Sequence, residues 1–165
     1  MIHLATGLLV REERLLMVAS QYANHLQPLW NLPGGRQQPG ELLAETVVRE
    51  VFEETRLHVK AGDVAYVSES YDGATHYLNV TFNVTPTGAS FDVACPERSR
   101  RAPDDRGEDD HVVGVEWVPI AEVGDRIVVA VVREPLLAYL RGDLPRRYAG
   151  FHRAGITIEW PQGSK

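Results

Sequence analysis

Three glutamates, Glu50, Glu53 and Glu54, stand at spacings that place them together on one face of a helix. With 3.6 residues per helical turn, side chains three and four positions apart are neighbours, so these carboxylates repel one another. They also fall in the carboxyl-terminal half of the helix predicted below, where the helix dipole disfavours negative charge. Because this arrangement costs stability, we expect a cation to compensate it, and Mg²⁺ prefers oxygen ligands of this kind.

The neighbouring residues bear on this metal-site interpretation. Arg49 can pair with Glu45 or Glu53 one turn away, but one cation does not neutralise the whole acidic group. A solvated acidic helix face is the alternative interpretation. The preceding Pro33-Gly34-Gly35 favours the metal site, because the backbone of a glycine-rich loop can approach a ligand closely and offer it a carbonyl oxygen.

The element that must carry the glutamates is a helix over residues 41–55. Leu43, Val47 and Val51 recur every four residues, with a second apolar row beside them, which is typical of one broad helical face packed on a core. We therefore predict a helix of about four turns from Glu41 to Thr55.

Strands are predicted on both sides of this helix. Short apolar runs separated by a charged turn indicate two strands before it, and two longer runs joined by Asp72-Gly73-Ala74 indicate a hairpin after it. Another strand precedes Pro119. The predicted strands are Leu4–Val10, Leu15–Ala19, Val64–Tyr71, Thr75–Val84 and Val112–Val118.

The rest of the chain is less regular. The core pattern lapses over residues 85–110, which we interpret as a flexible insertion, and helical material follows from Ile120 to Arg141. Pro135 is expected in the first turn of a final helix, and Ile156–Trp160 is a candidate short strand. We predict a single domain over residues 1–165 of α/β or α+β class, with a mixed β-sheet between helices.

Composition restricts the function classes. The chain has 165 residues, 44% hydrophobic, with 17 basic and 23 acidic residues and a formal net charge of −6. The acidic balance argues against binding to nucleic acid or an anionic membrane. No apolar run is long enough for a transmembrane helix, no signal peptide is apparent, and the single Cys95 allows no internal disulfide. We therefore expect a cytoplasmic protein.

The segment from Gly35 to Leu57 resembles the Nudix box of the Nudix hydrolases, G-x5-E-x7-R-E-U-x-E-E-x-G-U, where U is a bulky aliphatic residue. Gly35, Glu41, the Arg49-Glu50-Val51 run, the Glu53-Glu54 pair and Leu57 match the fixed positions over 23 residues. The preceding Trp30-Asn31-Leu32-Pro33-Gly34 is also similar to the family's lead-in. Arg56 is the one departure, because the family has glycine there. We expect a different helix end at Arg56, since glycine adopts the left-handed cap conformation at lower cost.

The resemblance implies roles for these residues. Glu50, Glu53 and Glu54 correspond to the family's metal ligands, with Glu50 either a ligand or the base that deprotonates water. Arg49 corresponds to the arginine that orients the carboxylates, and Glu41 to the glutamate that pairs with it. The carbonyl of Gly35 is a further expected metal ligand.

Three residues outside the box are weaker candidates. Related enzymes often complete the metal site with an acidic residue from the loop before the last long strand, and Glu108 is the preferred candidate there; a solvated acidic loop is the alternative. Tyr77 and Asn79 lie on the polar face of a predicted strand, where they could line a nucleotide pocket or face solvent.

The expected activity is Mg²⁺-dependent pyrophosphohydrolysis, with Mn²⁺ as an alternative metal, of a nucleoside diphosphate linked to another moiety. The small size favours (deoxy)nucleoside triphosphates, cleaved to a monophosphate and pyrophosphate. ADP-ribose, dinucleoside polyphosphates and nucleotide sugars stay open, as does a non-catalytic Nudix-like regulator that binds ligands. The resemblance also makes a homodimer reasonable.

Overall fold

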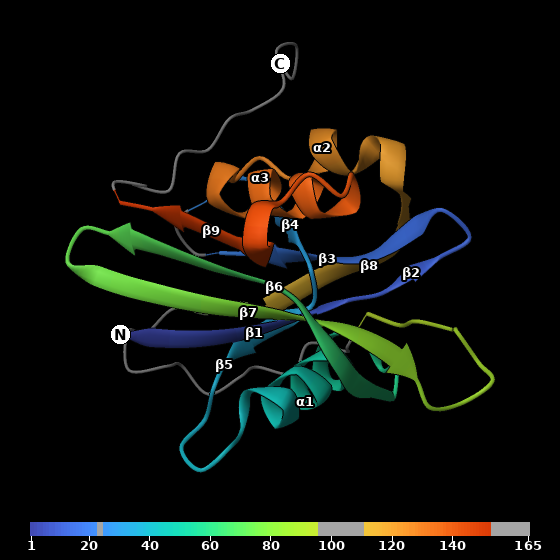
Figure 1. Cartoon of the computed structure of the whole chain (residues 1–165). Helices are drawn as coiled ribbons and strands as arrows, with labels where there is room; N and C mark the ends of the chain where they lie inside the picture. Colours follow the sequence, from blue (N-terminus) through green and yellow to red (C-terminus); the bar gives the residue numbers. More distant parts are fainter. Residues whose placement is uncertain (23–24, 96–110, 153–165) are drawn as a thin grey trace.

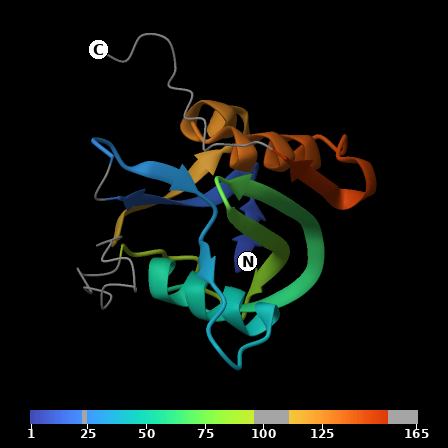
Figure 2. The same cartoon turned by 90° about the vertical axis from the view of Figure 1, so that its left-hand side faces the viewer.

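The computed structural model describes residues 1–22, 25–95 and 111–152. Its two β-sheets lie between helices: α1 covers one side, and α2 and α3 cover the other (Figures 1 and 2). The helices are α1 (Leu43–Thr55), α2 (Val123–Arg126) and α3 (Ala130–Leu140), with 3₁₀ turns at Ile120–Glu122 and Pro145–Arg147. Among the described residues, no helix has the length and apolar character needed to cross a bilayer. The predicted mixed α/β fold class is confirmed.

The first sheet is mixed and has five strands in the order β5-β1-β7-β6-β9. β1 runs parallel to β7, and β9 runs parallel to β6, while the other pairs are antiparallel. The strands are β1 (Ile2–Leu8), β5 (Gly34–Arg36), β6 (Val59–Asp72), β7 (Thr75–Pro86) and β9 (Tyr148–Phe151).

The second sheet is antiparallel and centres on β3. β8 pairs with β3 along its whole length, whereas β2 and β4 pair with its beginning and its end. The strands are β2 (Val10–Arg11), β3 (Arg14–Gln21), β4 (Leu29–Asn31) and β8 (His111–Pro119). β4 leads within three residues into β5, so the chain passes here from one sheet to the other.

The predicted strands and hairpin are confirmed with shifted ends. β6 and β7 are joined at Gly73, whose φ of +57° suits a glycine in a tight turn. β6 begins at Val59, five residues before the predicted start, because irregular pairing between Ala61 and Tyr66 interrupts its alternating pattern. The short strands β4, β5 and β9 were not predicted, since a run of three or four residues is too short for a periodic signal.

α1 packs directly on β1. A Cβ atom at Gly7 would lie 2.8 Å from Cγ2 of Val51 and 3.3 Å from Cγ2 of Val47, so glycine lets the helix approach the strand closely. Val47 and Val51 are fully buried, as the spacing predicts. This packing fixes the rotation of α1 and therefore the direction in which its acidic face points.

α1 begins at Leu43, two residues after the predicted start. The backbone N–H of Leu42 donates to Oε2 of Glu45 at 2.8 Å, which satisfies one of the N–H groups at the helix start. Glu41 therefore lies in the loop before the helix. Glu45 caps the helix start and does not pair with Arg49 as the spacing had allowed.

The expectation of a different helix end at Arg56 is wrong. Arg56 adopts the left-handed conformation with φ of +63°, and its N–H bonds to the carbonyl of Phe52 at 2.9 Å. The helix thus ends where a glycine would end it. Thr55, which is fully buried, also donates from its hydroxyl to the Val51 carbonyl at 2.7 Å. These contacts fix the helix end. Arg56 is therefore held in the left-handed conformation, which is unfavourable for a residue other than glycine.

Replacing Arg56 with glycine should therefore raise the melting temperature. A non-glycine residue in the left-handed region costs about 1 kcal/mol, worth about 2–4 °C in a chain of this size. The guanidinium of Arg56 lies 5.7 Å from the Phe52 ring centroid, an exposed contact that offsets only part of this gain. Thermal denaturation of Arg56→Gly and Arg56→Ala tests the cause: the alanine variant keeps the Cβ and should not be stabilised. Equal melting temperatures for both variants would contradict the assignment of this cost to the left-handed backbone of Arg56.

Besides β9, the C-terminal part differs from the prediction at Pro135. Pro135 lies at the sixth residue of α3 and not in its first turn. Its nitrogen has no hydrogen to donate to the carbonyl of Val131, so the helix loses one internal hydrogen bond. Burial of Pro135 and Leu136 in the core offsets that loss. The candidate strand Ile156–Trp160 and residues 96–110 of the expected insertion lie outside the described residues.

Candidate active site

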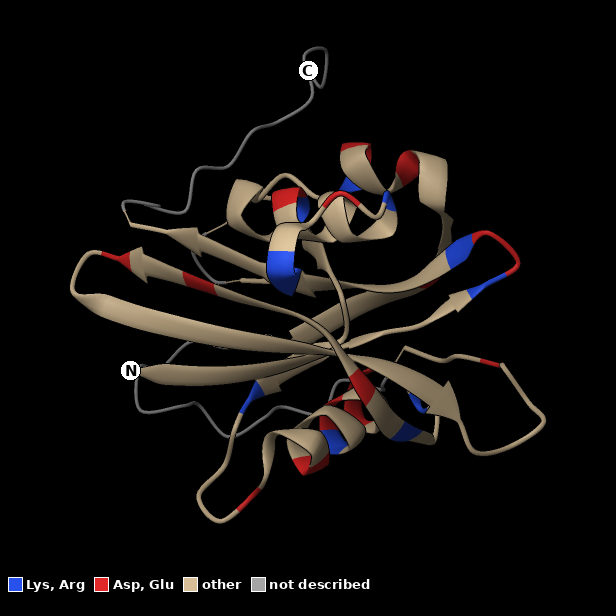
Figure 3. Cartoon of the chain, viewed as in Figure 1, with Lys and Arg blue, Asp and Glu red and all other residues tan. Residues whose placement is uncertain are grey.

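Arg49 is the centre of the acidic face of α1, where Figure 3 shows acidic and basic residues side by side. Its Nε and Nη2 bond to the two carboxylate oxygens of Glu41 at 2.6 and 3.0 Å, a two-point contact that only a guanidinium forms. Its Nη1 lies 2.7 Å from Oε1 of Glu50 and 3.4 Å from Oε2 of Glu53. Nη2 also donates to the carbonyl of Arg36 at 3.1 Å. One guanidinium therefore holds three carboxylates and the strand β5.

Glu41 is fixed by the loop as well as by Arg49. Its Oε2 accepts the N–H of Gln38 at 3.1 Å and the hydroxyl of Thr46 at 2.9 Å. The hydrogen bond from Arg49 is the main reason that the pKa of Glu41 falls to about 2, despite an opposing contribution from burial. The same bond raises the pKa of Arg49. Both groups are therefore charged throughout the physiological range.

This ion pair predicts an acid-dependent loss of stability. A carboxylate whose pKa is lower in the folded chain stabilises the fold in full above its ordinary pKa of 4.5, and the effect is lost as the pH falls toward about 2. Urea unfolding of the wild type and of Glu41→Gln should thus give a free-energy difference that is constant near neutral pH and shrinks below about pH 4.5. A difference independent of pH down to pH 3 would contradict this assignment.

Glu50 and Glu54 contact the glycine loop on β5. The N–H of Gly34 donates to Oε2 of Glu54 at 2.8 Å. A Cβ atom at Gly35 would lie 2.6 Å from the carboxyl carbon of Glu50, so only glycine leaves room for that carboxylate. Glu50 and Glu54 are only 2% and 8% exposed, respectively. The alternative interpretation, a solvated acidic helix face, therefore does not hold for Glu50 and Glu54, which lie in a buried seam between α1 and β5. Glu53 is partly exposed.

The donor chemistry of this seam suits a hard divalent cation. Glu50, Glu53 and Glu54 offer carboxylate oxygens on one helix face, and the backbone of Gly35 lies beside them. Within residues 1–22, 25–95 and 111–152, no three acidic, histidine or cysteine side chains already converge as a metal site. The residues present fit such an ion in type and in location, although their oxygens are not yet gathered around one point.

The candidates outside the box are placed differently. Tyr77 and Asn79 lie on the face of the first sheet turned away from α1, because the alternate residues of β7 pair with the β1 residues that contact the helix. Asn79 donates to the hydroxyl of Thr6 at 3.2 Å and so joins a polar group on that face. These two side chains therefore lie on the opposite face of the sheet from the helix that carries the glutamates. Glu108 lies outside the described residues.

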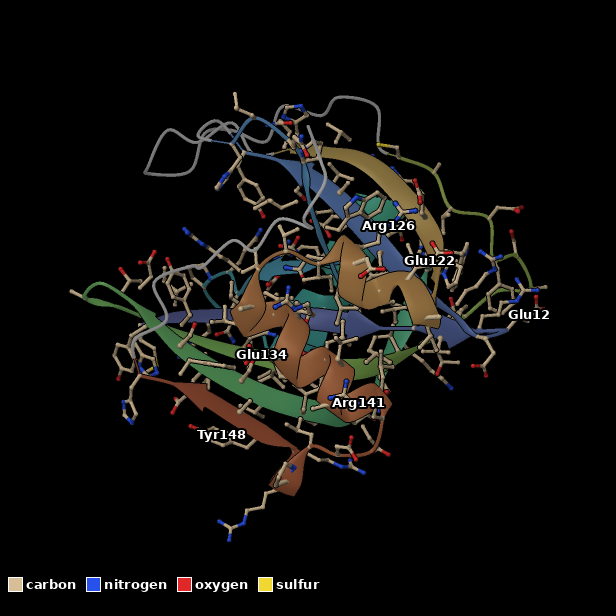
Figure 4. The ribbon with its side chains drawn as sticks, turned by 90° about the horizontal axis from the view of Figure 1, so that it is seen from above. Glu12, Glu122, Arg126, Glu134, Arg141 and Tyr148 are labelled. Atoms are coloured by element: carbon tan, nitrogen blue, oxygen red, sulfur yellow. The ribbon has the colours of Figure 1, made fainter. Side chains whose placement is uncertain are left out.

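A pocket of about 500 Å³ beside β4 was missed by the sequence reasoning. The guanidinium carbon of Arg126 lies 5.1 Å from the ring centroid of Trp30, and its Nη1 lies 3.2 Å from Oε2 of Glu116. Figure 4 shows Arg126, the last residue of α2, above the second sheet. Gly114 also lines the pocket, close to the indole of Trp30. The sequence offered one signal for this pocket, Trp30 before the Pro33-Gly34-Gly35 turn. The pocket could not be predicted from it, because Arg126, which contacts Trp30, lies far away in the sequence.

Comparison with known proteins gives a consistent result. A family model described as NUDIX domain matches residues 1–140. A segment of 46 residues is 50% identical to the mouse protein "Nucleoside diphosphate-linked moiety X motif 6", covering 28% of this chain and 14% of that protein. A segment of 28 residues is 64% identical to the "Putative 8-oxo-dGTP diphosphatase" of Bacillus subtilis, covering 17% and 19%. The matched segments thus span less than a fifth of either curated relative.

Solved structures share the fold over most of the chain. A MutT protein from Methanosarcina mazei Go1 superposes with a TM-score of 0.65 at 22% identity, covering 86% of this chain and 94% of that one. An ADP-ribose pyrophosphatase from Streptococcus suis superposes with a TM-score of 0.59 at 17% identity, covering 92% and 98%. At these identities, the likeness extends to the arrangement of sheets and helices and no further.

Proposed function

The chain belongs to the NUDIX domain family, and from this premise we propose that it is a divalent-metal-dependent pyrophosphohydrolase of nucleoside diphosphate derivatives. The observation that carries the proposal is the network around Arg49, which holds Glu41, Glu50 and Glu53 beside a glycine loop shaped to admit carboxylates. Buried acidic groups gathered in this way cost stability, so a function that needs them explains their presence.

The residues of the seam have two expected roles, holding the cation and orienting its ligands. Glu54, Glu53 and Glu50, with the carbonyl of Gly35, are the groups that would hold the cation. A bound divalent cation neutralises diphosphate charge and lowers the pKa of a coordinated water. Arg49 orients Glu50 through the 2.7 Å contact, and the Gly34 N–H orients Glu54. Glu50 would be a ligand or would accept the proton of the attacking water.

We propose nucleoside or deoxynucleoside triphosphates as the substrate class. Water attacks a phosphorus of the phosphoanhydride, the bond to the bridging oxygen breaks, and a nucleoside monophosphate and pyrophosphate leave. The printed name of the Bacillus subtilis relative supports this class. Trp30 supports it as well, because an indole beside a 500 Å³ pocket offers a face for a nucleobase. Trp30 lies four residues before Gly34, so the two are at most about 14 Å apart.

Two alternatives follow from specific observations. An ADP-ribose pyrophosphatase shares the fold, so ADP-ribose is the second candidate substrate. A non-catalytic, ligand-binding module is the second candidate function. The module is disfavoured by the acidic group that Arg49 holds, because a protein that only binds has no need for so many carboxylates at one place. The group consists of Glu41, Glu50, Glu53 and Glu54.

A hydrolysis screen tests the proposal. Nucleoside triphosphates, ADP-ribose, dinucleoside polyphosphates and nucleotide sugars are incubated with the protein in Mg²⁺, in Mn²⁺ and in chelator, and the products are separated by ion exchange. We expect a monophosphate and pyrophosphate from a triphosphate with metal, and loss of turnover in chelator that returns when metal is restored. Turnover unaffected by chelator would contradict the metal site. No turnover of any substrate by folded, metal-loaded protein would favour the binding module.

A further inference from the structure

A small recess of about 180 Å³ opens at the far edge of the first sheet, where β6 and β9 run side by side (Figure 1). Its lining combines three aromatic residues, one carboxylate, one imidazole and one glycine. The lining residues are Glu69, Tyr71, Tyr148, Gly150, Phe151 and His152. Aromatic rings present negative charge on their faces, so rings beside a carboxylate form an environment suited to a cation.

The recess is separate from the candidate active site. Gly35 lies on β5 at one edge of the five-stranded sheet, whereas Glu69 and Tyr148 lie on β6 and β9 at the other. Strands in a sheet are about 4.8 Å apart, so β5 and β6 are separated by about 14 Å in this direction alone. A ligand in the recess does not occupy the seam between α1 and β5.

Hydrogen bonds hold the carboxylate in place. The hydroxyl of Tyr148 donates to Oε1 of Glu69 at 2.5 Å, and Nε2 of His76 lies 3.0 Å from Oε2. Together these two contacts hold the pKa of Glu69 below its ordinary value, so the group is ionised at neutral pH. His76 in turn stacks on Tyr71, with ring centroids 4.4 Å apart and an angle of 5° between the planes. The negative charge is therefore fixed between two tyrosines.

Gly150 allows this arrangement. A Cβ atom there would lie 2.7 Å from the hydroxyl oxygen of Tyr148 and 3.3 Å from its ring. A side chain at this position would displace the Tyr148 ring, so glycine favours its contact with Glu69. Figure 4 shows Tyr148 on the outer edge of the sheet, where a ligand can approach from solvent.

We propose that this recess binds a small quaternary ammonium group. Its volume is below the range of pockets for drug-sized ligands, so it suits a head group and not a whole nucleotide. Aromatic residues make up half of the lining, which favours a cation that presents methyl groups over one that presents N–H donors. Methylated ammonium groups meet this condition, because their charge is felt by the rings and by the carboxylate without a hydrogen bond.

The test uses the full chain, with choline as the probe and its uncharged isostere 3,3-dimethylbutan-1-ol as the control ligand. Titrations followed by ¹H–¹⁵N spectra should shift amide signals of residues 67–76 and 148–152 with choline and leave those of residues 34–54 in place. Equal binding of the uncharged isostere would overturn the proposal, since it would show that an apolar recess suffices. Shifts confined to residues 34–54 would overturn it too.

Two variants, each of which removes one negative charge, show whether choline binding depends on the Glu69 carboxylate itself or on the net charge of the protein. Glu69→Gln should weaken choline binding about tenfold or more, because the recess loses the negative charge that lies beside the aromatic rings. Asp72→Asn, in the exposed hairpin end, removes the same charge outside the recess and should bind choline as the wild type does. Equal weakening in both variants would overturn the proposal. Neither residue belongs to the Arg49 network, so nucleotide hydrolysis reports on the two sites independently.

Discussion

Replacing Glu54 with glutamine is expected to lower kcat by about 10²–10³-fold while the fold remains intact. The amide oxygen of glutamine can still accept the Gly34 N–H that now bonds to Oε2 of Glu54 at 2.8 Å. The substitution therefore preserves the shape and the hydrogen bond from Gly34 and removes one negative charge from the seam. If Glu54 holds a divalent cation there, that charge is what the reaction needs. Initial rates at saturating substrate, measured over a range of Mg²⁺ concentrations, test this expectation.

Glu45→Gln is the matched control for that experiment. Glu45 lies on the same helix and undergoes the same charge change, but its carboxylate bonds to the helix start at Leu42 and lies away from the glycine loop. Its kcat should stay within about twofold of the wild type. Urea unfolding of both variants establishes that they are folded. Wild-type turnover in a folded Glu54→Gln protein would place the metal chemistry elsewhere.

The spacing of residues was enough to predict the helix and the direction of its acidic face. Helical pitch is a local property, so Val47 and Val51 could be assigned to the core and the glutamates to another face without knowledge of the rest of the chain. The pairing of Arg49 with Glu53, one turn away, could be expected for the same reason, and the structure confirms that contact.

The remaining features depend on contacts between distant parts of the chain. Whether Glu50 is exposed or buried depends on where the chain passes after β4, and the sequence pattern contains no sign of β5. β9 pairs with β6 across about eighty residues, from Val67 to Tyr148, so the recess at Glu69 was not predictable. The left-handed Arg56 shows the same limit, because tertiary packing of α1 overrides the local preference for glycine.

Replacing Arg49 should have a large effect on stability as well as on turnover. Its guanidinium serves Glu41, Glu50 and Glu53 at once, and the side chain of Glu50 is only 3% exposed. Arg49→Met leaves these carboxylates without their shared cation, and breaking a largely buried ion pair by removing one partner costs about 3–5 kcal/mol. Arg49→Lys restores the charge but not the two-point contact with Glu41, so we expect an intermediate loss. Urea unfolding at neutral pH measures both.

Turnover distinguishes an orienting role of Arg49 from a purely structural one. If the arginine orients Glu50 and Glu53 for chemistry, Arg49→Lys should lower kcat strongly under conditions where the variant is fully folded. Arg141→Lys provides the control, because Arg141 is exposed and its partner Asp143 lies outside the seam. A lysine variant that loses stability but keeps wild-type kcat would limit Arg49 to holding the loop and the helix together. Loss of both would mean that one guanidinium supports the fold and aligns the carboxylates, which is why its exchange for another cation is not conservative.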